Sequence, residues 1–200
     1  MQLSQRLLLT VSIFVDQIKW IFDEPDYEHL DEYFFISVDG VHCRITEPRH
    51  MPSSGWYSAK YNKAGLVYEL GVAVYHDNVC WVNGPFPAGQ NDLRVFRKDD
   101  GLMSKIPDNK RAIADEGYVG EPTKTATRNE FDDDNVKELK KRAKARHESV
   151  NGRLKAFGIL NQTFRTPGKQ RLQKHQAAFE ACCVLVQMEL DNGSRKLMKV

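Results

Sequence analysis

Three segments rich in β-branched and aromatic residues follow one another in the first half of the chain. They cover residues 33–46, 66–75 and 79–82, and only His76-Asp77-Asn78 separates the last two. A connection this short joins antiparallel strands, because a parallel crossover needs about a dozen residues or more. The pattern therefore predicts a three-stranded antiparallel meander, and this constrains the fold more than any other feature of the sequence.

Helical and extended patterns alternate after the meander. Asn91 is a suitable N-cap for a helix over residues 92–106, and a short apolar strand is predicted over residues 111–115. A strand that follows a crossover helix usually pairs in parallel with the sheet. Residues 123–127 are predicted as a short edge strand, and residues 135–160 and 171–190 as long helices. The expected fold class is α/β, a mixed sheet of meander and parallel strands flanked by helices.

Length and composition indicate one globular domain. The 200 residues are 41% hydrophobic and 28% charged, which suits a single core. We expect an N-terminal helix (2–22) and acidic linker within residues 1–32, the main domain over 33–190, and a tail over 191–200. The apolar run at 7–15 is about half as long as a membrane span, so no membrane partner is expected. Four cysteines without metal-site or disulfide spacing favour a reducing, intracellular location.

Positive charge is concentrated in the second half of the chain. The net charge is +2, yet residues 137–174 contain twelve lysines and arginines and only two glutamates. Such a segment favours a polyanionic partner such as DNA. The predicted DNA-binding residues are Lys141, Lys144, Arg146, Arg153 and Lys155. The same basic run, "KKRAKAR", is also typical of nuclear import, which favours the nucleus.

One stripe of the helix over residues 135–160 combines these bases with a carboxylate. Lys141, Lys144, Glu148, Gly152 and Lys155 recur at helical spacing. We interpret the lysines as phosphate contacts and Gly152 as a position that lets another backbone approach closely. The simpler alternative is a solvated helix surface, with Glu148 paired to its neighbouring lysines.

Two predicted strands end in an aspartate after apolar residues, at Asp39 in "FFISVDG" and at Asp115 in "RAIADEGY". In α/β sheets functional groups gather at the carboxyl ends of strands. Two neighbouring carboxylates repel unless a divalent cation lies between them, so both are predicted as metal ligands, with Glu148 as the third. Oxygen ligands favour Mg²⁺ or Mn²⁺, and two such ions can promote phosphodiester cleavage. We expect the three carboxylates to converge in one crevice, near enough to share ions, and to move apart in the absence of metal because like charges repel.

Simpler interpretations stay open for these positions. Each of the two aspartates could be a turn residue. Asp92 is interpreted as a carboxylate that caps the following helix rather than as a ligand. His42 and His147 are left out of the metal site, because a strand neighbour points to the opposite face and a helix neighbour turns about 100° away.

Five segments in this order resemble the DDE catalytic domain of PIF/Harbinger-type transposases, which has an RNase H-like fold. They are "ISVDGVH", "AGLVYELGVAV", "GPFPAGQNDLRVFR", "AIADEGYVGE" and "RHESVNGRLKAFGIL". The resemblance covers roughly residues 33–190 and rests on the ordered set. It implies that Asp39 and Asp115 take the places of the family's two aspartates and Glu148 that of its glutamate. It also implies metal-dependent DNA hydrolysis and strand transfer by transesterification.

The resemblance leaves two functions to weigh. The first is a DDE endonuclease or transposase domain that holds two Mg²⁺ or Mn²⁺ ions. The alternative is a non-catalytic derivative that keeps the fold and the basic helix for binding DNA or a protein. Family members usually carry a helix-turn-helix domain ahead of the catalytic core, whereas about thirty residues precede the first strand here. A separate DNA-binding helper protein is therefore an expected partner besides DNA, and an oligomer is compatible with this interpretation.

Overall fold

The computed structural model describes residues 18, 20, 32–48, 53–165, 170–193 and 196–200. Its centre is a six-stranded sheet in the order β2-β3-β1-β5-β6, with β4 also paired to β3. Strands β1 (Phe34–Arg44), β3 (Lys63–Ala73) and β4 (Val79–Pro87) form the predicted antiparallel meander. The short strand β2 (Tyr57–Ser58), which was not predicted, pairs with the start of β3. The N-terminal helix and acidic linker predicted before residue 33 lie almost wholly outside the described residues.

Parallel strands complete the other side of the sheet. β5 (Arg111–Ala114) pairs in parallel with β1, which confirms the predicted parallel strand. The predicted edge strand is β6 (Thr125–Ala126), and it pairs in parallel with β5. The β1–β5 pairing ends where Val38 lies opposite Ala114, whereas β1 continues to Arg44. The prediction that Asp39 ends a strand is therefore wrong. Asp39 lies within β1, and what ends beside it is the neighbouring strand.

Residues 92–106 were predicted to form one helix, and this prediction is wrong. Helix α2 (Asp92–Phe96) is short, and after a turn the 3₁₀ helix η3 (Leu102–Lys105) follows. Gly101 explains the break, because a Cβ there would lie 2.4 Å from the Phe96 carbonyl oxygen. The chain can fold back this closely only at a residue without a side chain. Two further 3₁₀ turns are η2 (Ser53–Trp56) and η4 (Glu116–Tyr118).

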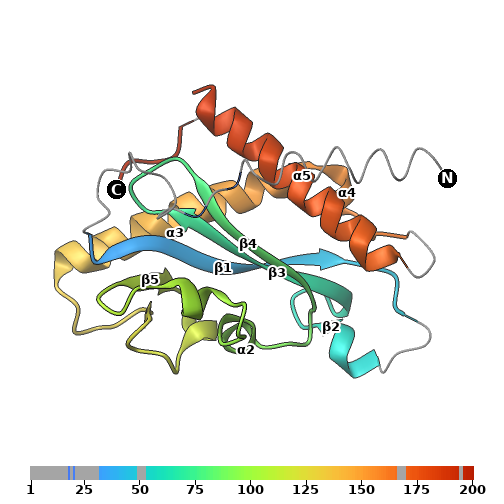
Figure 1. Cartoon of the computed structure of the whole chain (residues 1–200), viewed down its shortest axis with the longest axis horizontal. Coiled ribbons are helices and arrows are strands. Elements are labelled where there is room, and N and C mark those ends of the chain that lie inside the picture. Colours follow the sequence, from blue (N-terminus) through green and yellow to red (C-terminus); the bar gives the residue numbers. More distant parts are fainter. Residues whose placement is uncertain (1–17, 19, 21–31, 49–52, 166–169, 194–195) are drawn as a thin grey trace.

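Three helices follow β6: α3 (Asp134–Ala156), α4 (Gly158–Asn161) and α5 (Arg171–Asp191). The predicted helix over 135–160 is divided at Phe157, whose backbone is extended, and the predicted last helix is confirmed. Helices α3 and α5 pack on one face of the sheet and α2 on the other (Figure 1). No helix within the described ranges is long and apolar enough to cross a bilayer.

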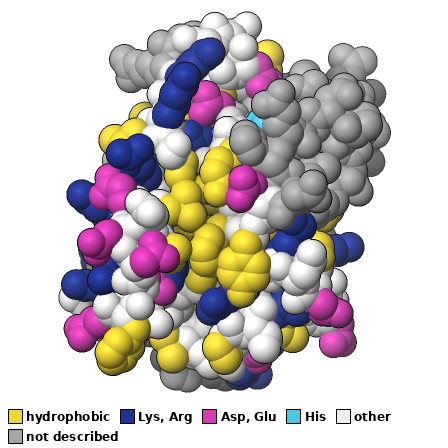
Figure 2. Space-filling model, turned by 90° about the vertical axis from the view of Figure 1, so that its left-hand side faces the viewer, with side chains coloured by type: hydrophobic (Ala, Val, Ile, Leu, Met, Phe, Trp, Pro, Cys, Tyr) yellow, Lys and Arg dark blue, Asp and Glu magenta, His cyan; other side chains and the backbone are white. Residues whose placement is uncertain are grey.

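The start of α3 is held by a cap and by ion pairs. The Asp133 carboxylate accepts a hydrogen bond from the Val136 N–H at 2.9 Å. Lys140 Nζ lies 2.6 Å from Asp132 Oδ2, and Lys137 Nζ lies 3.8 Å from Asp134 Oδ1. The end of the molecule that carries this part of α3 shows basic and acidic side chains interspersed around apolar ones (Figure 2). The positive charge of α3 is thus partly balanced by acids just before it.

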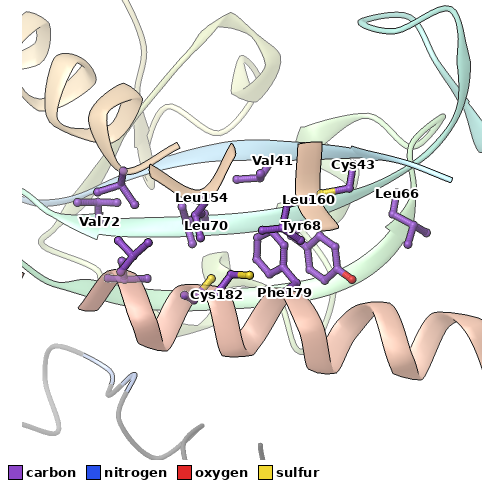
Figure 3. Packing of buried hydrophobic residues seen from close by; sticks show 14 of the residues in the cluster. Val41, Cys43, Leu66, Tyr68, Leu70, Val72, Leu154, Leu160, Phe179 and Cys182 are labelled. Carbon is purple, nitrogen blue, oxygen red and sulfur yellow. The ribbon is translucent and has the colours of Figure 1, made fainter. Parts of the chain in front are cut away.

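The main core lies between the sheet and the layer of α3 and α5. The Tyr68 ring on β3 stacks on the Phe179 ring of α5, with centroids 3.8 Å apart (Figure 3). Leu66, Leu70 and Val72 lie on the same face of β3 as Tyr68, because alternate residues of a strand point to the same side. A second cluster, with Ile36, Trp81, Phe96, Leu102 and Tyr118, fills the space between the sheet and α2. The sheet is therefore covered on both faces, which confirms the α/β class.

The chain after α5 returns to the domain. Leu197 is buried in the main core, and the Met198 carbonyl oxygen accepts a hydrogen bond from Arg146 of α3. Leu197 and Met198, within the predicted C-terminal tail over 191–200, thus contact the predicted domain over 33–190.

Candidate active site

Asp39 is half-buried on β1, and its side chain points toward α3. Oδ1 accepts a hydrogen bond from the Gly40 N–H at 2.7 Å, and Oδ2 accepts one from Asn151 Nδ2 at 3.2 Å. Burial raises the pKa of the Asp39 carboxyl, while the Gly40 N–H and the charges of Lys60 and Lys144 act in the opposite direction. The carboxylate is therefore costly to keep charged and is held by two donors.

Asp115 follows β5 directly and is exposed. Because Val38 and Ala114 are partners, Asp39 and Asp115 are the next residues along two adjacent strands. Asp115 Oδ1 accepts a hydrogen bond from the Gly117 N–H at 2.8 Å and caps η4. Asp115 is thus a turn residue, as the simpler interpretation has it, and also a neighbour of Asp39.

Glu148 lies on α3, exposed, on the side of the sheet toward which Asp39 points. His147, directly before it, is buried and its Nδ1 lies 2.9 Å from Ser37 Oγ of β1. Asn151, one helical turn after Glu148, is the residue that contacts Asp39. Burial lowers the pKa of His147 to about 4, and the negative charges of Glu148 and Asp115 oppose this shift. Glu148 thus lies on the same helix as Asn151, three residues before the side chain that contacts Asp39.

Sequence reasoning missed Asp92, the first residue of α2. Its interpretation as the helix cap is wrong, because Asn91 accepts the hydrogen bond from the Leu93 N–H at 2.8 Å. Burial raises the pKa of the Asp92 carboxyl to about 6, and the negative charges of Asp115 and Asp39 raise it in the same direction. Asp92 is therefore a third aspartate of this region.

Two glycines make room for Asp92. Its Oδ1 lies 2.8 Å from the position that a Cβ on Gly40 would take, and its Oδ2 lies 2.7 Å from that on Gly117. The same position on Gly117 is 3.0 Å from Asp115 Oδ1. A glycine shortly after each aspartate, in "DG" and "DEG", was the available sequence signal, although it does not identify what approaches the glycines.

The side chains do not form a closed ligand set. Within the described ranges, no three or more His, Cys, Asp or Glu side chains are grouped so that they could hold a metal ion. The three predicted ligands are therefore not grouped around one position in this structure, in line with the expected separation of like charges without metal. The hydrogen bonds explain this, because Asp39 and Asp115 turn toward the donors of Gly40, Asn151 and Gly117. The donor type does fit a hard divalent cation, since two carboxylate oxygens, of Asp92 and Asp115, lie beside the position that a Cβ on Gly117 would fill.

A family model described as DDE superfamily endonuclease matches residues 38–187. The match spans most of the chain and contains all the carboxylates described above. The chain belongs to the DDE superfamily endonuclease family. The comparisons found no matching curated protein and no matching solved structure. Membership in this endonuclease family indicates a nuclease or transposase that acts on DNA, and the mixed sheet flanked by helices is consistent with the RNase H-like fold of DDE enzymes.

A lysine that sequence reasoning missed also lies near the carboxylates of this DDE endonuclease. Lys60 is in the turn between β2 and β3, which is fixed to β1 at His42. Ser58 Oγ lies 3.1 Å from His42 Nδ1, and the Tyr61 hydroxyl donates to the His42 carbonyl oxygen at 3.3 Å. Lys60 itself is exposed and has no ion-pair or hydrogen-bond partner among the described residues, while its charge lowers the pKa values of Asp39 and Asp92. It is therefore available to an anion beside the carboxylates.

Arg146 does not fit its predicted role as a DNA contact. Its side chain is 3% exposed, and the guanidinium donates to the carbonyl oxygens of His76 and Met198. It also lies 3.2 Å from Asp77 Oδ1. Arg146 thus ties α3 to the β3–β4 turn and to the end of the chain.

Lys155 and Arg153 are also largely engaged by the protein. Lys155 Nζ donates to the carbonyl oxygens of His42 and Leu160, which orients it toward β1 rather than toward solvent. The Arg153 side chain is 13% exposed, with Nη1 3.9 Å from Glu189 Oε2. These interactions do not favour the predicted phosphate contacts.

The remaining predicted DNA-binding residues are accessible. Lys141 is largely exposed, with Nζ 3.5 Å from Glu138 Oε2, and Lys144 is exposed with its charge acting on Asp39. The prediction that Gly152 receives another backbone is wrong, because nothing lies within 4 Å of the position of its missing Cβ. Lys144 and Lys60 are therefore the two basic residues best placed beside the carboxylates.

Proposed function

We propose that the chain is a metal-dependent DNA endonuclease domain of the PIF/Harbinger type. Asp39, Asp115 and Glu148 are the catalytic carboxylates of this proposal. The observation that carries it is the arrangement of three elements. Asp39 and Asp115 follow a paired position on adjacent parallel strands, and α3 brings Glu148 to the same edge. The family match supports the reaction class.

In this proposal the three carboxylates would hold Mg²⁺ or Mn²⁺, two ions in all. Bound ions of this kind supply activation of water and neutralisation of charge on the phosphate. Asn151 keeps the Asp39 carboxylate oriented through its amide, and the missing side chains of Gly40 and Gly117 leave the edge of the sheet open. Lys60 and Lys144 would contact phosphate oxygens on either side of the cleaved bond.

The reaction is a displacement at phosphorus. The oxygen of water forms a bond to phosphorus while the bond to the 3′ oxygen breaks, which leaves a 3′-hydroxyl and a 5′-phosphate. In strand transfer the freed 3′-hydroxyl takes the place of water: its oxygen forms a bond to a phosphorus of target DNA while the bond from that phosphorus to the target 3′ oxygen breaks, which leaves a 3′-hydroxyl on the target strand. Both steps need the same oriented carboxylates and the same phosphate contacts.

Nicking of supercoiled plasmid DNA tests the proposal. The wild-type chain should convert supercoiled to open-circular DNA with Mn²⁺ or Mg²⁺ and not with EDTA, and Asp39→Asn should lack this activity. Ligase should reseal the product, because resealing requires a 3′-hydroxyl beside a 5′-phosphate. Equal nicking by wild type and Asp39→Asn would attribute the activity to a contaminant and remove the enzyme proposal.

The second candidate is a non-catalytic derivative that binds DNA or a protein. One observation favours it, namely that the described carboxylates are not grouped as a ligand set. This alternative predicts DNA binding without nicking, and no change of thermal stability when Mn²⁺ is added. The endonuclease proposal predicts nicking and a higher melting temperature with Mn²⁺, so the two candidates give opposite results in these two assays.

Replacing Lys60 and Lys144 together with glutamine should weaken DNA binding and its salt dependence. Two lost phosphate contacts should reduce the slope of log affinity against log salt concentration by about 2 units for duplex DNA. Fluorescence anisotropy at several salt concentrations measures this slope. The matched control is the double replacement of Lys137 and Lys141 with glutamine, because both lysines already pair with acids. A wild-type slope in the Lys60 and Lys144 double variant would show that these two lysines do not contact phosphates.

The proposal also covers the cellular location of the protein and the selection of its DNA target. A nuclear location follows from the basic run at the start of α3, and a separate DNA-binding protein would select the target sequence. Fractionation of cells that express the chain tests the first point. Co-purification with a DNA-binding protein tests the second.

A further inference from the structure

His147 of α3 is a buried polar side chain that uses only one of its two ring nitrogens. Its Nδ1 lies 2.9 Å from Ser37 Oγ, and the Ser37 hydroxyl donates to the Val72 carbonyl oxygen at 3.2 Å, so Nδ1–H is the donor to Oγ. Nε2 is buried and has no hydrogen-bond partner among the residues that the structure describes. Burying a polar atom without a partner costs free energy, so stability alone does not explain an imidazole at this position.

The bond from His147 to Ser37 runs beside the contact between Asn151 and Asp39. Ser37 and Asp39 are alternate residues of β1 and point to the same face, and His147 and Asn151 are one turn apart on α3. Two strand residues span about 6.6 Å and four helical residues about 6 Å, so the two contacts match in spacing. A helix held at one point can still rotate about it, whereas two matched contacts fix both its rotation and its position along the strand.

Ser37 has a fixed place relative to both aspartates of the site. It lies two residues before Asp39 on β1, and its partner on β5 is Ile113, which lies two residues before Asp115. A bond to Ser37 therefore places α3 relative to both strands at once. The contact through Asp39 cannot hold α3 while that carboxylate binds an ion, whereas the Ser37 hydroxyl has no part in the proposed chemistry.

We propose that His147 is a positioning residue, whose bond to Ser37 holds α3 in place on β1 and thereby sets Glu148 against Asp39 and Asp115. Glu148 follows His147 directly, so a contact that fixes His147 also fixes the backbone that carries Glu148. The inference rests on the proposed function, because it concerns the placement of a carboxylate of that site.

The replacement His147→Leu removes the bond and leaves no unpaired polar atom behind. Leucine is apolar, and Ser37 keeps the Val72 carbonyl oxygen as its acceptor. The variant should therefore melt at the wild-type temperature or above it. Its plasmid nicking rate at saturating DNA and Mn²⁺ should fall roughly ten- to hundredfold, since a misplacement of about 1 Å costs a rate of this order. The DNA concentration for half-maximal rate should not change, because Lys60 and Lys144 are untouched.

The replacement His147→Asn should restore the rate, because the amide nitrogen of asparagine can take the place of Nδ1 as the donor to Ser37. This variant should nick DNA at close to the wild-type rate and yet melt at a lower temperature, since a smaller side chain leaves a cavity and asparagine favours a helix less. Val150→Ala is the matched control, a truncation in the main core on the same helix. It should lower the melting temperature and leave the nicking rate unchanged at a temperature where all the variants are folded.

The outcomes separate this inference from the proposed function. A stable but slow His147→Leu variant together with a less stable but fast His147→Asn variant supports the positioning role. A wild-type rate in His147→Leu, a slow His147→Asn variant, or loss of folding in His147→Leu would each overturn that role. The proposed function would still stand in those cases if the wild-type chain nicks DNA and Asp39→Asn does not. Absence of nicking by the wild-type chain would overturn both.

Discussion

Single replacement of Asp39 or Asp115 with asparagine, or of Glu148 with glutamine, should lower the rate of plasmid nicking roughly a thousandfold. Metal ions at such sites stabilise the transition state by several kcal/mol, and each ~1.4 kcal/mol corresponds to a tenfold change in rate. The variants should remain folded, because Asp115 and Glu148 are exposed and Asp39 is only half-buried. Initial rates of nicking at saturating Mn²⁺ measure the effect.

Double variants test whether the three carboxylates act together. Residues of one catalytic unit lose most of the activity when any one is removed, so a double variant should be little worse than a single one. Glu138→Gln is the matched control, an exposed glutamate on the same helix that pairs with Lys141 and Arg142. A single variant that nicks DNA at the wild-type rate would remove that residue from the catalytic set.

Replacing Arg146 with leucine should lower the free energy of unfolding by about 3–5 kcal/mol, the loss typical when one partner of a buried charged pair is removed. The variant leaves Asp77 without its cation and leaves the carbonyl oxygens of His76 and Met198 without this donor. Urea denaturation followed by circular dichroism measures the change.

The matched control for this prediction is Lys144→Leu on the same helix. Because Lys144 is exposed, its replacement should change stability by less than about 0.5 kcal/mol. The two variants should behave oppositely toward DNA, with Lys144→Leu weakening binding and folded Arg146→Leu retaining it. Weak DNA binding by a fully stable Arg146→Leu variant would restore the role that the sequence suggested for this arginine.

Local sequence patterns were sufficient to predict most of the sheet. Alternating apolar residues and the three-residue connection at 76–78 indicated the meander, and the crossover rule indicated that β5 is parallel to β1. The helix over 92–106 failed because its break depends on a contact between Gly101 and the Phe96 carbonyl. A glycine in a helical pattern lowers the expectation of a helix, but it does not show which atom needs the space.

Residues of the candidate site could be predicted where the sequence pattern of a single strand or helix indicates them. Asp39 and Asp115 follow apolar strand residues, and the parallel pairing of β1 with β5 makes them neighbours. Asp92 was missed because its surroundings come from β1 and η4, which are distant in sequence.

The prediction that Arg146 and Lys155 contact DNA failed for a similar reason. The surroundings of Arg146 include the carbonyl oxygens of His76 and Met198, and those of Lys155 include that of His42. A helical pattern of bases cannot show which of them a distant backbone segment will engage. Only the tertiary structure separates Lys144, which stays exposed, from these two.

A Mn²⁺-soaked crystal, measured for anomalous scattering, tests most directly the claim that one cation site unites these carboxylates. The account predicts anomalous peaks within ligand distance of Asp39 and Asp115, with Glu148 reaching the same ions and the Asp39 carboxylate turned from Asn151 toward them. Saturating Mn²⁺ that gave no peak at this edge of the sheet, or peaks bound only by residues elsewhere, would contradict the account.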